Sequence, residues 1–259
     1  MSVKLMSGNE AIARGAFEAG VTVGTAYPGT PSTEILEQLS HYPGVHASWS
    51  PNEKVALEVA IGASLAGARA LAAMKHVGVN VAADPLMTLS YTGVGGGLLL
   101  VSADDPGMHS SQNEQDNRHY ARLAKIPLLE PSDSQEARDY VIAGFQLSEE
   151  FDTPLILRTT TRISHSRSLV QPGEKVERVC HGYRKDPAKY VMIPGFARQR
   201  RPLVEKRLEA LRQAADLSPL NRIEKGSTTY GIVCSGIAYQ YVREALPDAT
   251  LLKLGFSYP

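Results

Sequence analysis

Ser50-Pro51-Asn52-Glu53-Lys54-Val55-Ala56-Leu57-Glu58-Val59-Ala60-Ile61-Gly62-Ala63-Ser64 is the stretch around which this chain is organised. Pro51 suits the first position of a helix. Small or apolar residues occupy almost the whole circumference of that helix, which predicts that it is buried. A carboxylate, Glu53, stands in its first turn. The spacing of Ser50 and Glu53 is that of a capping box, which favours a structural role. A carboxylate in a poorly solvated place also needs a committed partner, so a ligand-binding role stays open beside the structural one.

Short apolar strands alternate with helices on both sides of this stretch, as far as about residue 160. We expect strands at 21–27, 45–49, 69–74, 98–102, 126–129 and 154–158, and helices at 7–20, 30–39, 51–64, 82–89, 114–123 and 132–149. Ser7 and Glu10 form the capping box of the first helix, and Thr30 is the expected N-cap of the second. The alternation predicts an α/β fold, a doubly wound domain with a mostly parallel sheet.

The residues that follow the strands are the unusual ones, and in such sheets ligands bind beyond the carboxyl ends of the strands. Four loops should therefore gather on one rim: 27–30, 50–53, 75–80 and 104–109. At Thr30, free amides and hydroxyls at a helix start could hold a substrate carboxylate, although an ordinary capped helix explains the same residues equally well. The polar loop 104–116 has no convincing metal-ligand spacing and is better interpreted as a lid or a subunit contact.

Beyond residue 160 the chain changes character. Residues 162–225 are highly charged and are interpreted as an ordered connector, with an amphipathic helix over 204–216 that places Leu203, Leu208 and Leu211 on one side. A second α/β unit then begins, with strands expected at 230–234 and 250–254 around a helix at 236–246. Two strands and one helix cannot bury a two-faced sheet, so we expect an incomplete domain with an exposed sheet edge, from a truncated product or a split gene. The predicted division is 1–165, 166–226 and 227–259.

Composition excludes several classes of protein. The 259 residues contain 27 Lys plus Arg and 27 Asp plus Glu, and this balance argues against nucleic acid as a partner. The two cysteines, Cys180 and Cys234, cannot form a disulfide framework or a four-cysteine cluster by themselves. No apolar run approaches the ~20 residues of a membrane-spanning helix, and the start lacks a signal-peptide core. We expect a cytoplasmic protein that does not bind a membrane.

Five segments together resemble one known family, the indolepyruvate ferredoxin oxidoreductases. The resemblance is to the N-terminal portion of the large, thiamine diphosphate-dependent alpha subunit, and it covers essentially the whole chain. The segments that carry it are Met6-Ser7-Gly8-Asn9-Glu10-Ala11, Ala26-Tyr27-Pro28-Gly29-Thr30-Pro31-Ser32-Thr33-Glu34, Asn52-Glu53-Lys54-Val55-Ala56, Met74-Lys75-His76-Val77-Gly78-Val79-Asn80 and residues 104–116.

The resemblance implies a role for each loop of the rim. Residues 1–165 would be the domain that binds the aminopyrimidine ring of thiamine diphosphate. Glu53 would be the catalytic glutamate, which hydrogen-bonds ring nitrogen N1′ and favours the imino tautomer that removes the thiazolium C2 proton. The implied cofactor contacts are Glu53, Pro28, Gly29, Val77 and Asn80. The implied substrate contacts are Thr30, Ser32, Lys75, His76 and His109, and no residue is assigned to a metal.

The implied activity is the oxidative decarboxylation of an arylpyruvate such as indolepyruvate to an acyl-CoA, with electrons passing to ferredoxin. Gly-Asp-Gly, the signature of the family's diphosphate- and magnesium-binding domain, occurs nowhere in the sequence, and neither does the cysteine-rich [4Fe-4S] domain. We therefore expect an incomplete cofactor site that is inactive alone. The implied partners are the remaining alpha-subunit domains or a downstream split product, a beta subunit, ferredoxin and CoA, in a dimer or higher oligomer.

Two alternatives stay open. The chain could be a non-catalytic remnant, or a binding subunit that pairs with a separate diphosphate-domain protein. It could also belong to another thiamine enzyme that processes 2-oxoacids, such as a decarboxylase.

Overall fold

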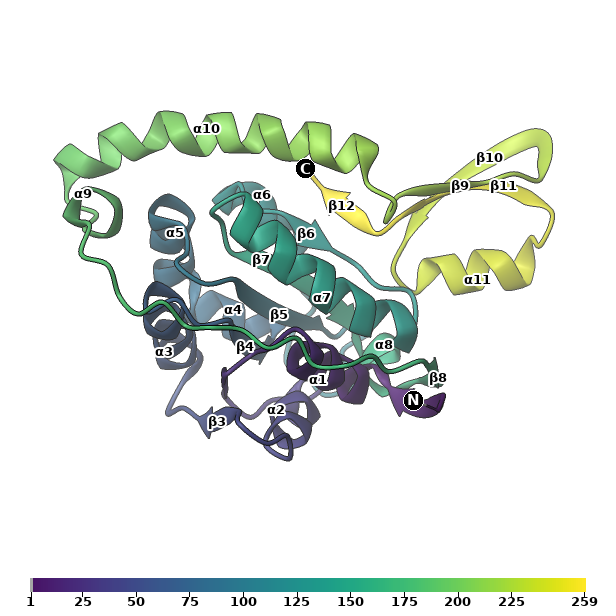
Figure 1. The fold of residues 1–259 in the computed structure, drawn as a ribbon. Coiled ribbons are helices and arrows are strands. Elements are labelled where there is room, and N and C mark those ends of the chain that lie inside the picture. The colour runs from purple at the N-terminus through teal and green to yellow at the C-terminus, as the bar shows by residue number, and fades with distance from the viewer. Residues whose placement is uncertain (1) are drawn as a thin grey trace.

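A seven-stranded, almost entirely parallel sheet forms the centre of the molecule (Figure 1). The computed structural model describes residues 2–259, with the side chain of residue 228 excepted. The strand order is β12-β6-β7-β5-β4-β2-β3, and only β12 runs antiparallel to its neighbour. The strands are β2 (Val23–Ala26), β3 (His46–Trp49), β4 (Ala70–Lys75), β5 (Leu98–Asp104), β6 (Leu128–Leu129), β7 (Leu155–Thr160) and β12 (Phe256–Tyr258).

Helices cover both faces of this sheet, which confirms the predicted doubly wound α/β fold. Strand β4 shows how the two cores arise: Leu71 and Ala73 face one core, and Ala72 and Met74 face the other. The helices of the first face are α1 (Gly8–Glu18), α2 (Thr33–Leu39) and α7 (Ser134–Glu150). The helices of the second face are α3 (Glu53–Leu65), α4 (His76–Val81), α5 (Ala83–Thr92) and α6 (Arg118–Ala124), and a short α8 (Thr161–His165) follows β7.

Of the predicted starts of α1 and α2, the first is confirmed and the second is wrong. The capping box of α1 is confirmed, because the Ser7 hydroxyl accepts from the Glu10 amide while the Glu10 carboxylate accepts from the Ser7 amide. The expected start of α2 at Thr30 is wrong. The amide and hydroxyl of Ser32 both donate to the carbonyl of Gly29, at 2.9 Å each, so these residues form a turn and the helix begins only at Thr33.

Two further expectations about helices are wrong. Residues 75–80 are not the loop that was expected, because 76–80 form most of α4 immediately after β4, and the helix expected at 82–89 follows as α5. The helix expected at 114–123 begins only at Arg118, because residues 105–117 are held in a loop by side-chain contacts.

The connector lies across the main domain (Figure 1). Strand β8 (Arg167–Val170) pairs antiparallel with β1 (Lys4–Ser7), and after a long extended stretch the chain forms α9 (Pro187–Tyr190) and α10 (Pro194–Leu217). Helix α10 is longer than predicted, and Leu203 is 49% exposed, so placing it on the buried side was wrong. Val204, Leu208, Leu211 and Ala215 form the buried side instead.

Helix α10 is also tied to the end of α5 by polar contacts. The guanidinium of Arg207 donates to the carbonyls of Ser90 and Asp152, and Arg200 donates to the carbonyl of Tyr91 at 2.7 Å. The last carbonyls of a helix lack partners within it, so these arginines satisfy groups that α5 leaves open.

The C-terminal segment forms a small three-stranded sheet of order β10-β11-β9, in which β10 and β11 are parallel. Its elements are β9 (Arg222–Glu224), β10 (Ser227–Ser235), α11 (Ala238–Ala245) and β11 (Ala249–Leu254). Sequence analysis missed β9 and also β12, which returns the chain to the main sheet by pairing with β6. Gly255 is the single residue between β11 and β12, and it packs against the hydroxyl of Tyr140 so closely that a side chain would not fit.

Within residues 2–259, no helix is both long and apolar enough to cross a membrane.

Candidate functional site

The carboxyl ends of β2, β3, β4 and β5 bring the predicted loops to one edge of the sheet. Two close approaches join them. Gly78 in α4 packs against the side chain of Glu53, and Gly29 packs against the side chain of Lys75. Residues from three of the four predicted segments, 27–30, 50–53 and 75–80, therefore meet on one rim.

Glu53 is the first residue of α3, so the expected helix start at Pro51 and the capping box with Ser50 are both wrong. Asn52 is the N-cap, and its side chain accepts from the Val55 amide at 2.9 Å. A cap needs a side chain oxygen two or three residues before the free amide, and Asn52 satisfies this geometry without Glu53. The carboxylate of Glu53 is therefore left without a capping duty.

Glu53 is 9% exposed, and its carboxylate has no hydrogen bond or ion pair with any other residue that the structure describes. Its neighbour is backbone: a Cβ built on Gly78 would lie 2.6 Å from Oε1. Only glycine at position 78 leaves room for the carboxylate in this place. The rest of α3 is less buried than predicted, since Val59 is 42% exposed on its outer side.

The loop after β2 carries the predicted contacts at positions 28–32. Ser32 is buried, and its hydroxyl is used to hold the turn, whereas Pro28 and Thr30 are exposed at the rim. Lys75 is half-buried, and its ammonium donates to the carbonyl of Ser110 at 3.2 Å. Lys75 thus connects this part of the rim with the loop after β5.

Helix α4 holds the other three predicted contacts of this strand end. His76 is fully buried, and its Nε2 lies 3.0 Å from the carbonyl of Asn113. Asn80 is exposed, and its side-chain oxygen accepts from the hydroxyl of Tyr120 at 2.6 Å. Val77 is half-buried between them.

The loop over residues 105–117 is ordered around Asp105. Its carboxylate accepts from the hydroxyls of Thr161 at 2.6 Å and Ser111 at 2.7 Å, and from the amide of Ser110 at 2.8 Å. Burial alone would raise the pKa of Asp105, but these hydrogen bonds outweigh it and hold the pKa below its usual range. The side chain of His109 is exposed on this loop.

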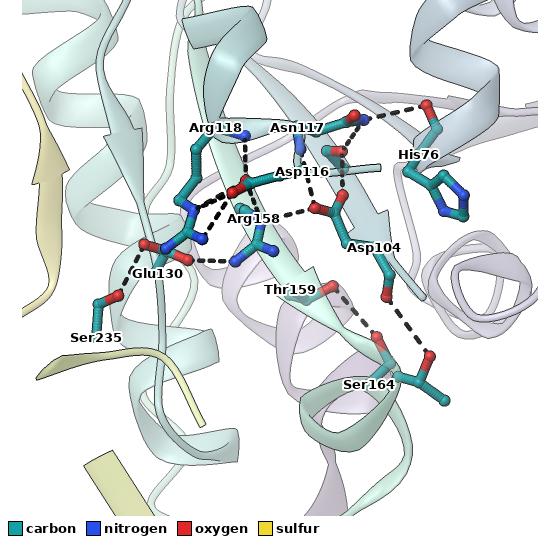
Figure 2. Close-up of polar contacts among 12 residues, drawn as sticks. His76, Asp104, Asp116, Asn117, Arg118, Glu130, Arg158, Thr159, Ser164 and Ser235 are labelled. Carbon is teal, nitrogen blue, oxygen red and sulfur yellow. Dashed lines mark hydrogen bonds and ion pairs between the residues drawn. The ribbon is translucent and has the colours of Figure 1, made fainter. Parts of the chain in front are cut away.

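A buried polar network behind the rim was missed by sequence analysis (Figure 2). Asp104 is fully buried and accepts from Arg158 Nε at 2.7 Å and from the Asn117 amide at 3.0 Å. Burial raises the pKa of Asp104 although Arg158 and the Asn117 amide act in the opposite direction. Arg158 also donates to Glu130 at 2.5 Å, and Glu130 accepts from Ser235 at 3.0 Å. One signal could have found it, because Asp104 and Arg158 are charged residues at the ends of apolar strands and need partners there.

Comparison with known proteins agrees with this arrangement. Residues 14–206 match the family model described as pyruvate flavodoxin/ferredoxin oxidoreductase, thiamine diphosphate-binding. The chain belongs to this family. The oxidoreductase family assignment agrees with the resemblance seen in the sequence.

Individual relatives were also found. The chain is 52% identical over 263 residues to the indolepyruvate oxidoreductase subunit IorA of Methanothermobacter marburgensis, and 48% identical over 265 residues to that of Archaeoglobus fulgidus. Each comparison covers 97% of this chain but only 42% of the relative, so the chain spans less than half the length of these subunits.

The fold of a solved oxidoreductase is similar as well. The 2-oxoglutarate:ferredoxin oxidoreductase from Magnetococcus marinus, with 2-oxoglutarate, coenzyme A and succinyl-CoA bound, superimposes with a TM-score of 0.78 at 17% identity. The superposition covers 99% of this chain and 54% of that one.

Proposed function

We propose that this chain supplies the aminopyrimidine-binding part of a thiamine diphosphate site in a 2-oxoacid:ferredoxin oxidoreductase. The observation that carries the proposal is the Glu53 carboxylate, which is 9% exposed and lies against Gly78 at the rim. A buried carboxylate without a donor is costly, and a hydrogen bond to a charged group contributes about 1.5–3 kcal/mol. A ligand that brings a donor to Glu53 would recover that free energy.

The residues around Glu53 fit the cofactor that the family implies. Because Gly78 has no side chain, there is room for the Glu53 carboxylate beside α4. Pro28, Gly29, Val77 and Asn80 are the proposed neighbours of the ring. Glu53 would hold the proton shared with ring nitrogen N1′. When bound, thiamine diphosphate supplies a thiazolium carbon that can add to a 2-oxo carbonyl and accept the electrons released by decarboxylation.

The proposed substrate is an arylpyruvate such as indolepyruvate, on the strength of the similarity to the IorA subunits. Lys75 would attract the substrate carboxylate, and Thr30, His76 and His109 are the other proposed contacts on the rim. Ser32 would act through the turn that its hydroxyl closes on Gly29.

The remaining assignments follow from the size of the relatives. Magnesium and the diphosphate group, the [4Fe-4S] clusters and the acyl-CoA product would be handled by the part of the enzyme outside these 259 residues. We also propose a beta subunit, ferredoxin and CoA as partners, and an assembly of at least a dimer. The proposed division of the chain is a pyrimidine-binding domain over 1–165, a connector over 166–226 and the start of a second α/β unit over 227–259.

The test is the Glu53→Gln variant, assayed in the assembled enzyme by indolepyruvate-dependent reduction of a viologen dye. Loss of the proton-holding carboxylate should lower kcat by about 10²-fold or more. Glu58→Gln on the same helix is the matched control, because the Glu58 side chain is 49% exposed and 4.0 Å from Lys54. Near-normal turnover by Glu53→Gln in a folded enzyme would refute the proposal.

A further inference from the structure

Asn117 links the loop after β5 to the start of α4. It is 1% exposed, and its side-chain amide donates to the carbonyl of His76 at 3.1 Å and to the hydroxyl of Ser102 at 2.9 Å. The loop also holds His76 through its ring, at the carbonyl of Asn113. The first residue of α4 is therefore held by the loop at both its backbone and its side chain, and Figure 2 shows the backbone contact, from Asn117 to the His76 carbonyl.

The chemistry of these partners fixes the orientation of the amide. A backbone carbonyl can only accept, so the atom of Asn117 that faces His76 must be the NH2 group. The opposite orientation would place two acceptors against each other. Asn117 Oδ1 is buried and has no partner among the described residues, so the side chain is held through its donor end.

Asn117 is itself held by the buried charge network. The backbone amide nitrogen of Asn117 donates to Asp104 Oδ2, and the Ser102 hydroxyl donates to Asp104 Oδ1 at 3.2 Å. Arg158 Nε donates to the same Asp104 Oδ2 atom at 2.7 Å. The strands β5 and β7 thus provide a rigid base for Asn117.

The start of α4 in turn sets the place of Glu53. Lys75, the N-cap of α4, provides no side-chain cap, and the helix is only six residues long, so contacts from outside must hold its first turn. Gly78 lies in that turn, two residues after His76, and its backbone forms the surface against which the Glu53 carboxylate packs.

We infer that Asn117 is a positioning residue, which acts through His76 and α4 to keep Gly78 under the Glu53 carboxylate. The inference rests on the proposed function only in that Glu53 is the group whose place matters. Arg158 and Asp104 hold Asn117, Asn117 holds α4, and α4 holds the carboxylate.

The test is Asn117→Asp, which keeps the shape of the side chain and replaces its donor by an acceptor. We expect amide hydrogen exchange in the peptide 76–82 of the full chain to rise by about tenfold, since one buried hydrogen bond is lost and another is weakened. Gln112→Glu is the matched control, because residue 112 is exposed on the same loop. An unchanged exchange rate in Asn117→Asp would overturn the inference. Exchange needs no substrate, so it decides the matter whichever result Glu53→Gln produces.

A pH series separates this role from general damage. A protonated carboxyl at position 117 has an O–H that can donate to the carbonyl of His76, and an ionised one does not. The exchange ratio of Asn117→Asp to the parent, taken at equal pH, should therefore fall toward one as the pH is lowered. The charged and titratable groups around this position are Asp104 on β5, His76 on α4, Glu130 next to β6, Arg158 on β7, and Asp116 and Arg118 beside it. A ratio that stays high at every pH would overturn the inference.

A second variant covers the case in which Asn117→Asp does not fold. Ser102→Ala removes one of the two acceptors of the Asn117 amide and changes a single atom. It should raise exchange in 76–82 in the same direction by a few-fold, and in the assembled enzyme it should weaken thiamine diphosphate binding. A normal exchange rate in 76–82 would overturn the inference.

Discussion

Gly78→Ala should displace the Glu53 carboxylate while leaving the fold intact. The new methyl group would lie 2.6 Å from both Cγ and Oε1 of Glu53 and 2.9 Å from Cδ. The shortest of these separations is 0.8 Å inside the 3.4 Å at which ordinary van der Waals contact begins. Glu53 has no hydrogen bond to a described residue that would resist the push, so its side chain should rotate away from α4.

The substitution should affect stability and activity to different degrees. Overpacking typically destabilises by about 1–3 kcal/mol, and exchanging a helical glycine for alanine returns about 1 kcal/mol, so the net loss of unfolding free energy should stay below about 2 kcal/mol. A shift of about 1 Å in a reacting group can lower the rate by about 10²-fold. Activity should therefore fall far more than stability.

The assay is viologen reduction by the assembled enzyme, together with thermal unfolding of the same preparation. Gly195→Ala is the control, because a Cβ at that helical glycine would meet no atom within 4 Å. Normal kcat and normal thiamine diphosphate affinity in Gly78→Ala would refute the reasoning, since the carboxylate would then not depend on the space that the glycine provides.

Two further predictions concern stability. Asp105→Asn should lower the melting temperature by several degrees at pH 7, because hydrogen bonds from Thr161 and Ser111 lose their charged acceptor. The pKa of Asp105 is depressed in the folded chain, so this stabilisation is present above about pH 4 and decreases progressively as the pH is lowered below that value. The gap between the melting temperatures of parent and variant should narrow over this acid range, and a constant gap would contradict the assignment. Arg207→Gln should lower the free energy of unfolding in urea by about 1–3 kcal/mol, because the carbonyls of Ser90 and Asp152 lose their donor. The exposed Lys206→Gln should change it by less than about 0.5 kcal/mol, and equal effects would count against the role of Arg207.

The architecture was predictable because the signal for it is local. A continuous apolar run such as 98–102 can only be buried on both faces, and its alternation with helices predicts the parallel sheet. The capping box of Ser7 and Glu10 was likewise readable, since both partners lie within one helical turn.

Features that depend on tertiary contacts were not predictable. Ser50 and Asn52 are both good caps by type, and their place after β3 decides that Asn52 caps α3. The turn that delays α2 exists because Ser32 reaches back to Gly29. In the network around Asp104, the partner Asn117 is 13 positions away in the sequence and the partner Arg158 is 54 positions away. No local sequence pattern marks such pairs.

The return of the chain from β11 to β12 through Gly255 has a consequence for dissecting this protein into fragments. A fragment that stops at the end of the connector would remove β12 and turn the two-residue β6 into the border of the main sheet. Leu128 and Leu129, both fully buried in the intact chain, would then lie on the edge strand itself. Expression boundaries placed between the connector and the C-terminal unit should therefore yield aggregation-prone material, and pieces intended for study in isolation should keep residues 256–258.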